Sequence, residues 1–242
     1  MEPFYFGQDD EIFGIYHAAE GMRKRHSIVV ASPLLNEYMR AHFALRRVSL
    51  SLAQSGFDVL RFDYSGMGNS KGSLEDTPPE KWIDNMSVAT QEITEISGNS
   101  RISIVAVRFA ANLAATVTHQ QEIDQFVMWD PILDGSHWLQ LLRNARPIIT
   151  TSFSESLLVK DREFMGHVTH PSFVTSIKSR SRVPIKSQKT YAVITDRGQL
   201  RGAPTNVAQR VDMVSFSCGW EDLSSQVLYP HEVIDSICAA IT

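Results

Sequence analysis

The sequence is poor in cysteine. Its 242 residues include only Cys218 and Cys238, and neither belongs to a CxxC pair or lies beside a histidine cluster. Disulfide-stabilised domains and structural zinc sites need several cysteines at close, regular spacing. We therefore predict two reduced, buried thiols and no metal site.

Long apolar runs and blocks of positive charge are also absent. No run approaches the roughly 20 apolar residues of a membrane-spanning helix, and the segment MEPFYFGQDD is acidic where a signal peptide is basic and then apolar. The net charge is -4 and the longest basic run lies at 23–25, which leaves no basic surface for phosphate groups. These features predict a soluble, cytoplasmic protein with no membrane span and no nucleic-acid partner.

Short β-rich runs alternate with segments of helical period along the chain. With 43% hydrophobic residues the sequence can form one substantial core, and this alternation is typical of an α/β domain with a mostly parallel central sheet flanked by helices. The strand predicted at 11–18 is expected at an edge of the sheet. The predicted strands lie at 11–18, 27–33, 57–66, 101–107, 125–131, 189–196 and 211–218, and the predicted helices at 39–54, 79–97, 109–120 and 231–241.

Nearly 60 residues separate the strand at 125–131 from the strand at 189–196. A connection of that length is too long for a simple loop in a compact domain. We predict a helical cap or lid at 132–188, inserted into a single domain that spans 1–242.

A glycine-containing turn, RFDYSGMGNSKG, follows the strand that begins at residue 57. It lacks the lysine and the spacing of a P-loop, and it does not match the dinucleotide-binding pattern. We predict a structural turn held by Asp63 and Ser65, and no cofactor.

Three segments together resemble α/β-hydrolases of the serine aminopeptidase and esterase kind: RFDYSGMGNSKG, the strand-turn-helix segment VAVRFAANLA, and WDP after the next strand. The resemblance is closest to bacterial hydrolase-like proteins associated with exosortase and exopolysaccharide systems or with biosynthetic gene clusters. It covers most of the chain and is firmest over 27–135. It implies the α/β-hydrolase fold, in which a serine in a GxSxG turn works with an acid and a histidine.

The sequence departs from that pattern at the nucleophile. Ala106 and Ala110 keep the small flanking residues of the turn, but Arg108 stands at its tip. Arginine stays protonated and cannot act as a nucleophile, so we do not expect ordinary serine-hydrolase chemistry. The resemblance places the acid at Asp196 and a tryptophan, Trp220, near the position of the histidine.

A buried cation at the turn needs an anionic partner. The resemblance implies that the loop SPLLNEYMRAH contributes to the oxyanion hole, and this loop offers Glu37. We predict an ion pair between Glu37 and Arg108. The predicted catalytic group is completed by Asp196 and His231, and the predicted ligand-binding residues are Leu35, Asn36, Phe109, Asp130, His137 and Trp220.

Three functions remain open at this point, and the sequence does not decide whether the protein is an enzyme. The first is a non-hydrolytic accessory or binding protein for a small-molecule or carrier-linked acyl, peptidyl or anionic intermediate in a bacterial biosynthetic pathway. In the second, Arg108 polarises a carbonyl for elimination, isomerisation or cyclisation while Asp196, Asp130 or His137 moves a proton. The third is a conventional esterase or thioesterase with a relocated nucleophile, Ser32 or Ser65. The resemblance also allows a homodimer.

Overall fold

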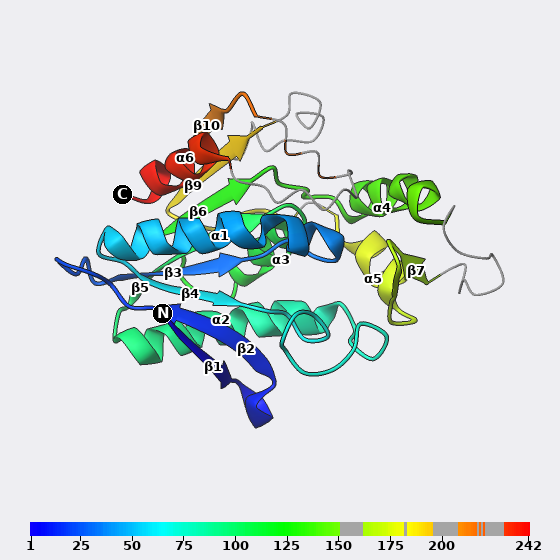
Figure 1. Ribbon diagram of the computed structural model, residues 1–242, viewed down its shortest axis with the longest axis horizontal. Helices are drawn as coiled ribbons and strands as arrows, with labels where there is room; N and C mark the ends of the chain where they lie inside the picture. The colour runs from blue at the N-terminus through cyan, green and yellow to red at the C-terminus, as the bar shows by residue number, and fades with distance from the viewer. Residues whose placement is uncertain (151–161, 182, 196–207, 217, 219, 221–229) are drawn as a thin grey trace.

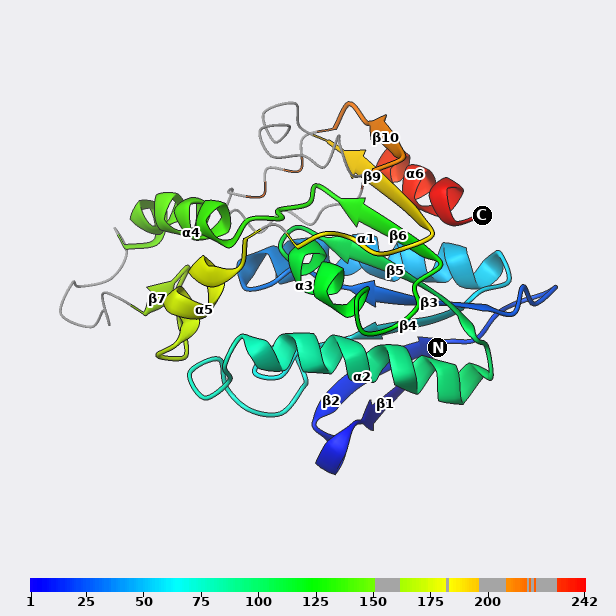
Figure 2. The ribbon, with the colours of Figure 1, turned by 180° about the vertical axis from the view of Figure 1, so that it is seen from behind.

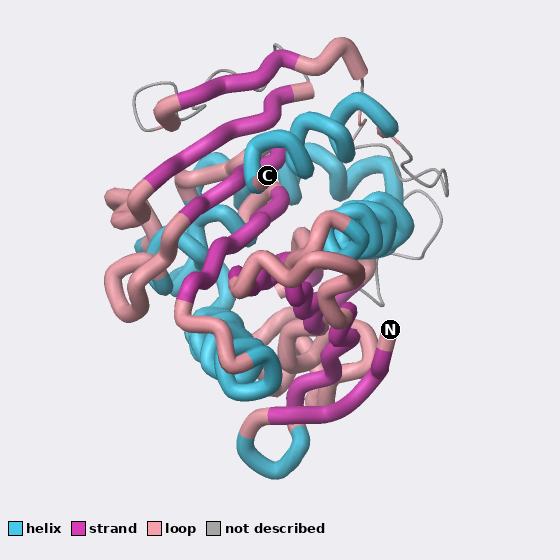
Figure 3. The backbone as a smooth tube through the Cα atoms, turned by 90° about the vertical axis from the view of Figure 1, so that its left-hand side faces the viewer, coloured by secondary structure: helices cyan, strands magenta, loops and turns pink. Residues whose placement is uncertain are grey.

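The computed structural model describes residues 1–150, 162–181, 183–195, 208–216, 218, 220 and 230–242. Its central feature is a twisted sheet (Figure 3), whose strands are β1 (Glu2–Phe6), β2 (Ile12–His17), β3 (His26–Ala31), β4 (Asp58–Phe62), β5 (Arg101–Val107), β6 (Gln125–Trp129), β9 (Lys189–Ile194) and β10 (Arg210–Met213). The spatial order is β1-β2-β4-β3-β5-β6-β9-β10. β2 pairs antiparallel with both β1 and β4, and the other neighbouring strands are parallel. The predicted mostly parallel sheet is confirmed.

Helices cover both faces of this sheet, which explains why the central strands read as continuous apolar runs. In β5, Ile104 and Ala106 pack into the core beneath α2 (Glu80–Ser97) and α3 (Ala110–Val117). Val105 and Val107 pack into the opposite core, beneath α1 (Asn36–Gln54) and α6 (His231–Ile241). Figures 1 and 2 show these two helical layers from opposite sides.

The chain between β6 and β9 forms four further elements in its described part. These elements lie beyond the carboxyl ends of the parallel strands (Figures 1 and 2). Trp138 and Phe173 anchor them, because both side chains are almost completely buried in the core on the α2 and α3 side. The elements are α4 (Gly135–Thr150), the short paired strands β7 (Glu163–Phe164) and β8 (His167–Val168), and α5 (Phe173–Ser179).

Two predictions about the elements are wrong, and the second bears on the site. The strand predicted at 11–18 is not at the edge, because β1 pairs outside it and had given no clear sequence signal. β1 contains Pro3 and is mostly exposed, as an edge strand can be. α1 begins at Asn36 rather than at residue 39, so Glu37 lies in the first turn of a helix and not in a loop.

The glycine-containing turn after β4 is structural, as predicted, for reasons that centre on Asp63. Its Oδ2 accepts a hydrogen bond from the backbone N–H of Asn69 at 2.9 Å. A side chain at Gly68 would begin 2.2 Å from the same oxygen, so only glycine fits there. Ser65 holds the turn through its backbone N–H, which donates to Asn85 Oδ1 at 2.8 Å.

Candidate functional site

Arg108 lies at the tip of a sharp turn between β5 and α3. Its φ is 57°, a left-handed conformation that is uncommon for residues other than glycine. The turn is fixed by its backbone: Arg108 N–H donates to the Trp129 carbonyl at 3.0 Å, and the Arg108 carbonyl accepts from Ala111 and Ile132 at 3.1 Å. The predicted strand-turn-helix is therefore present, with Arg108 at its tip.

The predicted ion pair between Glu37 and Arg108 is present. Arg108 Nε donates to Glu37 Oε1 at 2.8 Å. The exposed fraction is 0% for Arg108 and 6% for Glu37, so both charges are withdrawn from water. A second hydrogen bond, of 3.4 Å, joins Arg108 to the Asp130 carbonyl. The early start of α1 makes the pair possible, because it directs Glu37 toward the turn.

Trp220 links this ion pair to a buried acid. Its ring lies 5.2 Å from the Arg108 guanidinium carbon, within the range of a cation–π contact. Its Nε1–H donates to Asp130 Oδ2 at 2.8 Å. Asp130, at 0% exposure, also accepts hydrogen bonds from the backbone N–H and the hydroxyl of Thr195. We call Arg108, Glu37, Asp130 and Trp220 the elbow cluster.

Within the elbow cluster, Trp220 contacts both Asp130 and Arg108, as the histidine of a Ser-His-Asp triad contacts both the acid and the serine. In a triad, the acid accepts a hydrogen bond from one edge of the histidine ring while the other side of the ring faces the nucleophile. Here Trp220 donates to Asp130 from its ring nitrogen and presents its face to Arg108. Asp196, the acid that the sequence predicts, lies outside the described residues.

Aromatic side chains fill the space beside the turn. Phe109 is completely buried and stacks on Trp138 of α4, with ring centroids 4.1 Å apart and an interplanar angle of 7°. Leu35 is 3% exposed and has a left-handed φ of 54°. Asn36 is half-buried, and its Oδ1 contacts Nε2 of His167 in β8 at 2.7 Å. Burial lowers the pKa of His167, which favours its neutral form.

The two predicted site histidines are exposed at the surface. His137 is exposed on α4, and its backbone N–H donates to Asp134 Oδ1 at 2.8 Å. His231 is exposed at the first residue of α6, whereas Arg108 is buried. Within the described chain, Trp220 rather than either histidine occupies the space between Arg108 and Asp130.

Thr195 and Trp138 belong to the site but were not predicted. Thr195 directly precedes the predicted acid at the end of β9, which was a usable signal. Trp138 offered none, since its stacking partner is 29 positions away in the chain.

Both cysteines are free thiols, as predicted. Cys218 is buried, whereas Cys238 is only half-buried, so the prediction of burial is wrong for the second. Burial raises the pKa of the Cys218 thiol to about 12 and that of Cys238 to about 11. Both thiols are therefore protonated at neutral pH and are poor nucleophiles. Among the described residues, no group of three or more His, Cys, Asp or Glu side chains could hold a metal ion.

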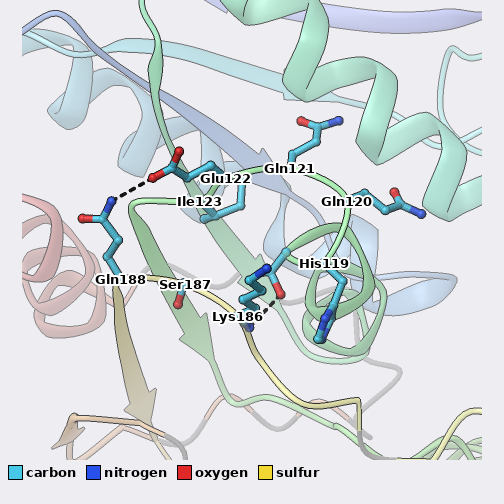
Figure 4. Close-up of a pocket in the computed structure, with 9 residues that line it drawn as sticks. His119, Gln120, Gln121, Glu122, Ile123, Lys186, Ser187 and Gln188 are labelled. Atoms are coloured by element: carbon cyan, nitrogen blue, oxygen red, sulfur yellow. Dashed lines mark hydrogen bonds between the residues drawn. The ribbon is translucent and has the colours of Figure 1, made fainter.

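A cavity of about 480 Å³ lies away from the elbow cluster (Figure 4). It is near the amino ends of β6 and β9, whereas Arg108 follows the carboxyl end of β5. Most of its lining residues are of polar types, and Gln188 donates to Glu122 at 3.2 Å. The lining residues are Thr118, His119, Gln120, Gln121, Glu122, Ile123, Lys186, Ser187 and Gln188.

No family model and no curated protein matches this sequence. Solved structures do match. Est1E from Butyrivibrio proteoclasticus, solved with ferulic acid, is 14% identical with a TM-score of 0.66, covering 98% of this chain and 97% of that one. A soluble variant of monoglyceride lipase from Saccharomyces cerevisiae is 10% identical with a TM-score of 0.63, covering 99% and 93%. An alpha-beta serine hydrolase homologue from Coxiella burnetii is 13% identical with a TM-score of 0.56, covering 88% and 85%.

Proposed function

The chain has the α/β-hydrolase fold, and we propose that it uses this fold without hydrolysing its ligand. Its role is that of an accessory or binding protein for an acyl, peptidyl or anionic intermediate in a bacterial biosynthetic pathway. One observation carries this proposal: Arg108, at the position of the nucleophile, is completely buried and bonded to Glu37. A guanidinium stays protonated in proteins and offers no nucleophile.

The position of the general base supports the same proposal. Trp220 has one N–H donor and no acceptor, so it cannot take a proton from a nucleophile or return one to a leaving group. It still donates to Asp130 at 2.8 Å. The acid therefore supports a ring that cannot carry out acid-base catalysis.

The two enzymatic alternatives receive less support. Altered chemistry at the turn needs Arg108 to reach a substrate carbonyl, but its side chain is only 1% exposed. A relocated nucleophile needs an accessible serine activated by a base. Ser32 and Ser65 are 6% and 5% exposed, and no hydrogen-bond partner of either hydroxyl is found in the described chain.

The ligand would bind at the carboxyl ends of the strands. There α4, β7 and α5 lie beyond the strand ends (Figure 1) and, with β8, form the proposed cap. Open α/β sheets generally bind ligands at this end. Arg108 acts beneath that surface as a fixed support rather than as a reacting group.

Reaction of the full chain with a fluorophosphonate probe, read by mass spectrometry, tests the proposal. We expect no labelled serine and no turnover of p-nitrophenyl esters above the buffer rate. The matched variants Ser32→Ala and Ser65→Ala identify the target if labelling occurs. Labelling of the wild-type protein that either variant abolishes would overturn the proposal in favour of a hydrolase with a relocated nucleophile.

A further inference from the structure

A second cavity, of about 130 Å³, lies between α1 and the outer strands of the sheet. Alternate residues of a strand face the same side, and Ile15 of β2 and Val30 of β3 are both in register with Arg61 of β4. α1 closes the cavity with residues from one of its faces. The lining residues are Phe13, Ile15, Val30, Ser32, Tyr38, His42, Leu45, Arg61, Phe62, Asp63 and Asn69, and none belongs to the elbow cluster.

Arg61 is a buried cation in this cavity with no carboxylate bonded to it. It is 9% exposed, and its Nε donates to Nε2 of His17 at 3.5 Å. Burial and the charge of Arg61 lower the pKa of His17 to about 4, so His17 is neutral at pH 7. Within the described chain, no acid lies within the 4.0 Å of an ion pair with Arg61.

Asp63 lines the same cavity but is already bonded to other groups. Its Oδ1 accepts from the Tyr38 hydroxyl at 2.8 Å, and its Oδ2 accepts from the Asn69 N–H. It therefore attracts Arg61 through space without neutralising it by contact. A buried charge without a contacting partner is costly, so an anion that reaches Arg61 would gain binding energy.

Ser32 gives a second and independent indication of a ligand. It is 6% exposed, faces the cavity at the end of β3, and its hydroxyl has no hydrogen-bond partner among the described residues. Buried hydroxyls are normally bonded, and an unsatisfied one points to a missing group. The hydroxyl and the Arg61 guanidinium together provide donors for one acceptor group.

We propose that this cavity binds a small aliphatic monocarboxylate. The carboxylate receives the fork of Arg61 and the hydroxyl of Ser32, while its short apolar end packs on Ile15, Val30 and Leu45. The volume equals that of about four water molecules at about 30 Å³ each, which suits an acid of a few carbon atoms.

The choice of a monocarboxylate follows from charge and shape. The planar guanidinium matches a carboxylate through two parallel hydrogen bonds. A phosphate dianion would bring a second negative charge close to Asp63, which is 7% exposed and shares the cavity. A neutral alcohol would leave Arg61 without an anion. The apolar walls favour a ligand with a short hydrocarbon part.

The test is titration of the full chain with sodium propionate at pH 7, followed by NMR, with 1-propanol and inorganic phosphate as matched probes. We expect propionate to bind more tightly than either. Arg61→Lys keeps the charge and loses the fork, and should weaken propionate binding about tenfold. Ser32→Ala removes one donor and should weaken it severalfold, while Arg101→Lys on the surface should change nothing.

Three outcomes would overturn the proposal. Equal binding of 1-propanol would show that charge is not recognised. Tighter binding of phosphate would assign the site to a different anion. Unchanged propionate binding in Ser32→Ala, a variant that removes a single oxygen atom, would show that the ligand lies elsewhere even if Arg61→Lys fails to fold.

Discussion

Arg108 combines two unfavourable features in one residue. Its left-handed φ of 57° strains the backbone, and its side chain places a charge where no water reaches it. Glu37 supplies the opposite charge, and Trp220 supplies an electron-rich ring face. These two contacts offset part of the cost of burying the Arg108 guanidinium.

Removing one partner should expose this dependence. We expect Glu37→Ala to lower the free energy of unfolding by about 3–5 kcal/mol, because it removes the carboxylate that accepts a 2.8 Å hydrogen bond from the buried guanidinium. Urea denaturation followed by circular dichroism measures the change. The control is Arg101→Ala, which breaks a 2.6 Å ion pair with Asp124 whose arginine is 59% exposed. That variant should lose less than about 1 kcal/mol, and equal losses would contradict the role of burial.

His26 is expected to make stability depend on pH. It is 3% exposed and contacts the Ser103 hydroxyl at 2.8 Å. Burial, helped by Arg101, lowers its pKa from 6.5 to about 4. Between pH 6.5 and about 4, His26 is therefore protonated in the unfolded chain and neutral in the folded protein. Stability should fall from pH 6.5 to about 4, by about 1.4 kcal/mol per pH unit for each such proton.

The variant His26→Gln keeps a polar side chain but removes the titrating group. We expect urea denaturation at intervals between pH 7.5 and 4.5 to show a smaller slope of the free energy of unfolding against pH. The decrease should correspond to about one proton. An unchanged slope would show that His26 is not the group responsible.

At the scale of elements, the contact between α4 and α5 depends on one glycine. Gly135 opens α4, and its N–H donates to the Arg180 carbonyl at 2.8 Å. A Cβ at this position would lie 1.8 Å from the Ile177 carbonyl oxygen, a backbone atom that cannot rotate away. At Gly135 the two helices of the proposed cap therefore lie too close together for any residue with a Cβ atom.

Gly135→Ala should separate these helices. We expect it to cost about 3 kcal/mol and to speed tryptic cleavage between β6 and β9, because the chain there loses its packing on the core. Gly98→Ala is the control: its φ of 69° strains alanine, but nothing lies within 4 Å. That variant should cost about 1 kcal/mol without new cleavage between β6 and β9. Equal cleavage of both variants would refute the packing argument.

The elements differ in how far the sequence could predict them. β5 was predicted at its observed bounds because its apolar run ends sharply, and α6 because Pro230 precedes a segment of helical period. β7 and β8 have two residues each, too few for a periodic pattern. β1 was missed since its outer face is exposed and it contains a proline.

The contacts of the site also differ in how far the sequence could predict them. The pair of Glu37 and Arg108 could be predicted, because a buried cation needs an anion and one loop offered it. The bond from Trp220 to Asp130 could not, since nothing in the sequence indicates which acceptor a buried tryptophan N–H will meet. The sequence favoured Asp196 as the acid because position along the chain was the only guide.

At the scale of the whole molecule, the sheet brings the ends of distant strands to one place. β5 leads into Arg108, β6 into Asp130 and β9 into Thr195, and all three lie at the same edge because these strands are parallel. On the function proposed above, Arg108 and Asp130 take the places of a nucleophile and an acid in this fold. We therefore expect the backbone of this fold to accommodate a serine at position 108 and a histidine at position 220.

The variant Glu37→Gln, Arg108→Ser, Trp220→His tests that expectation. The turn at position 108 already has the left-handed φ and small neighbours, and the ring at position 220 already faces Asp130. Glu37→Gln removes the carboxylate that would otherwise lose its cation. We expect fluorophosphonate labelling at position 108 and p-nitrophenyl acetate hydrolysis at least about tenfold above wild type, which still lies far below a natural triad.

Two further substitutions in this triple variant decide which acid supports the ring. Asp130→Asn should remove the gained activity, because an amide cannot hold the histidine in the productive tautomer. Asp196→Asn is the matched control and should leave most of it. If the reverse is found, the acid is Asp196, and the bond from Trp220 to Asp130 serves packing alone. If the triple variant folds but shows neither labelling nor ester hydrolysis, restoring a serine and a histidine is not sufficient for hydrolysis in this fold.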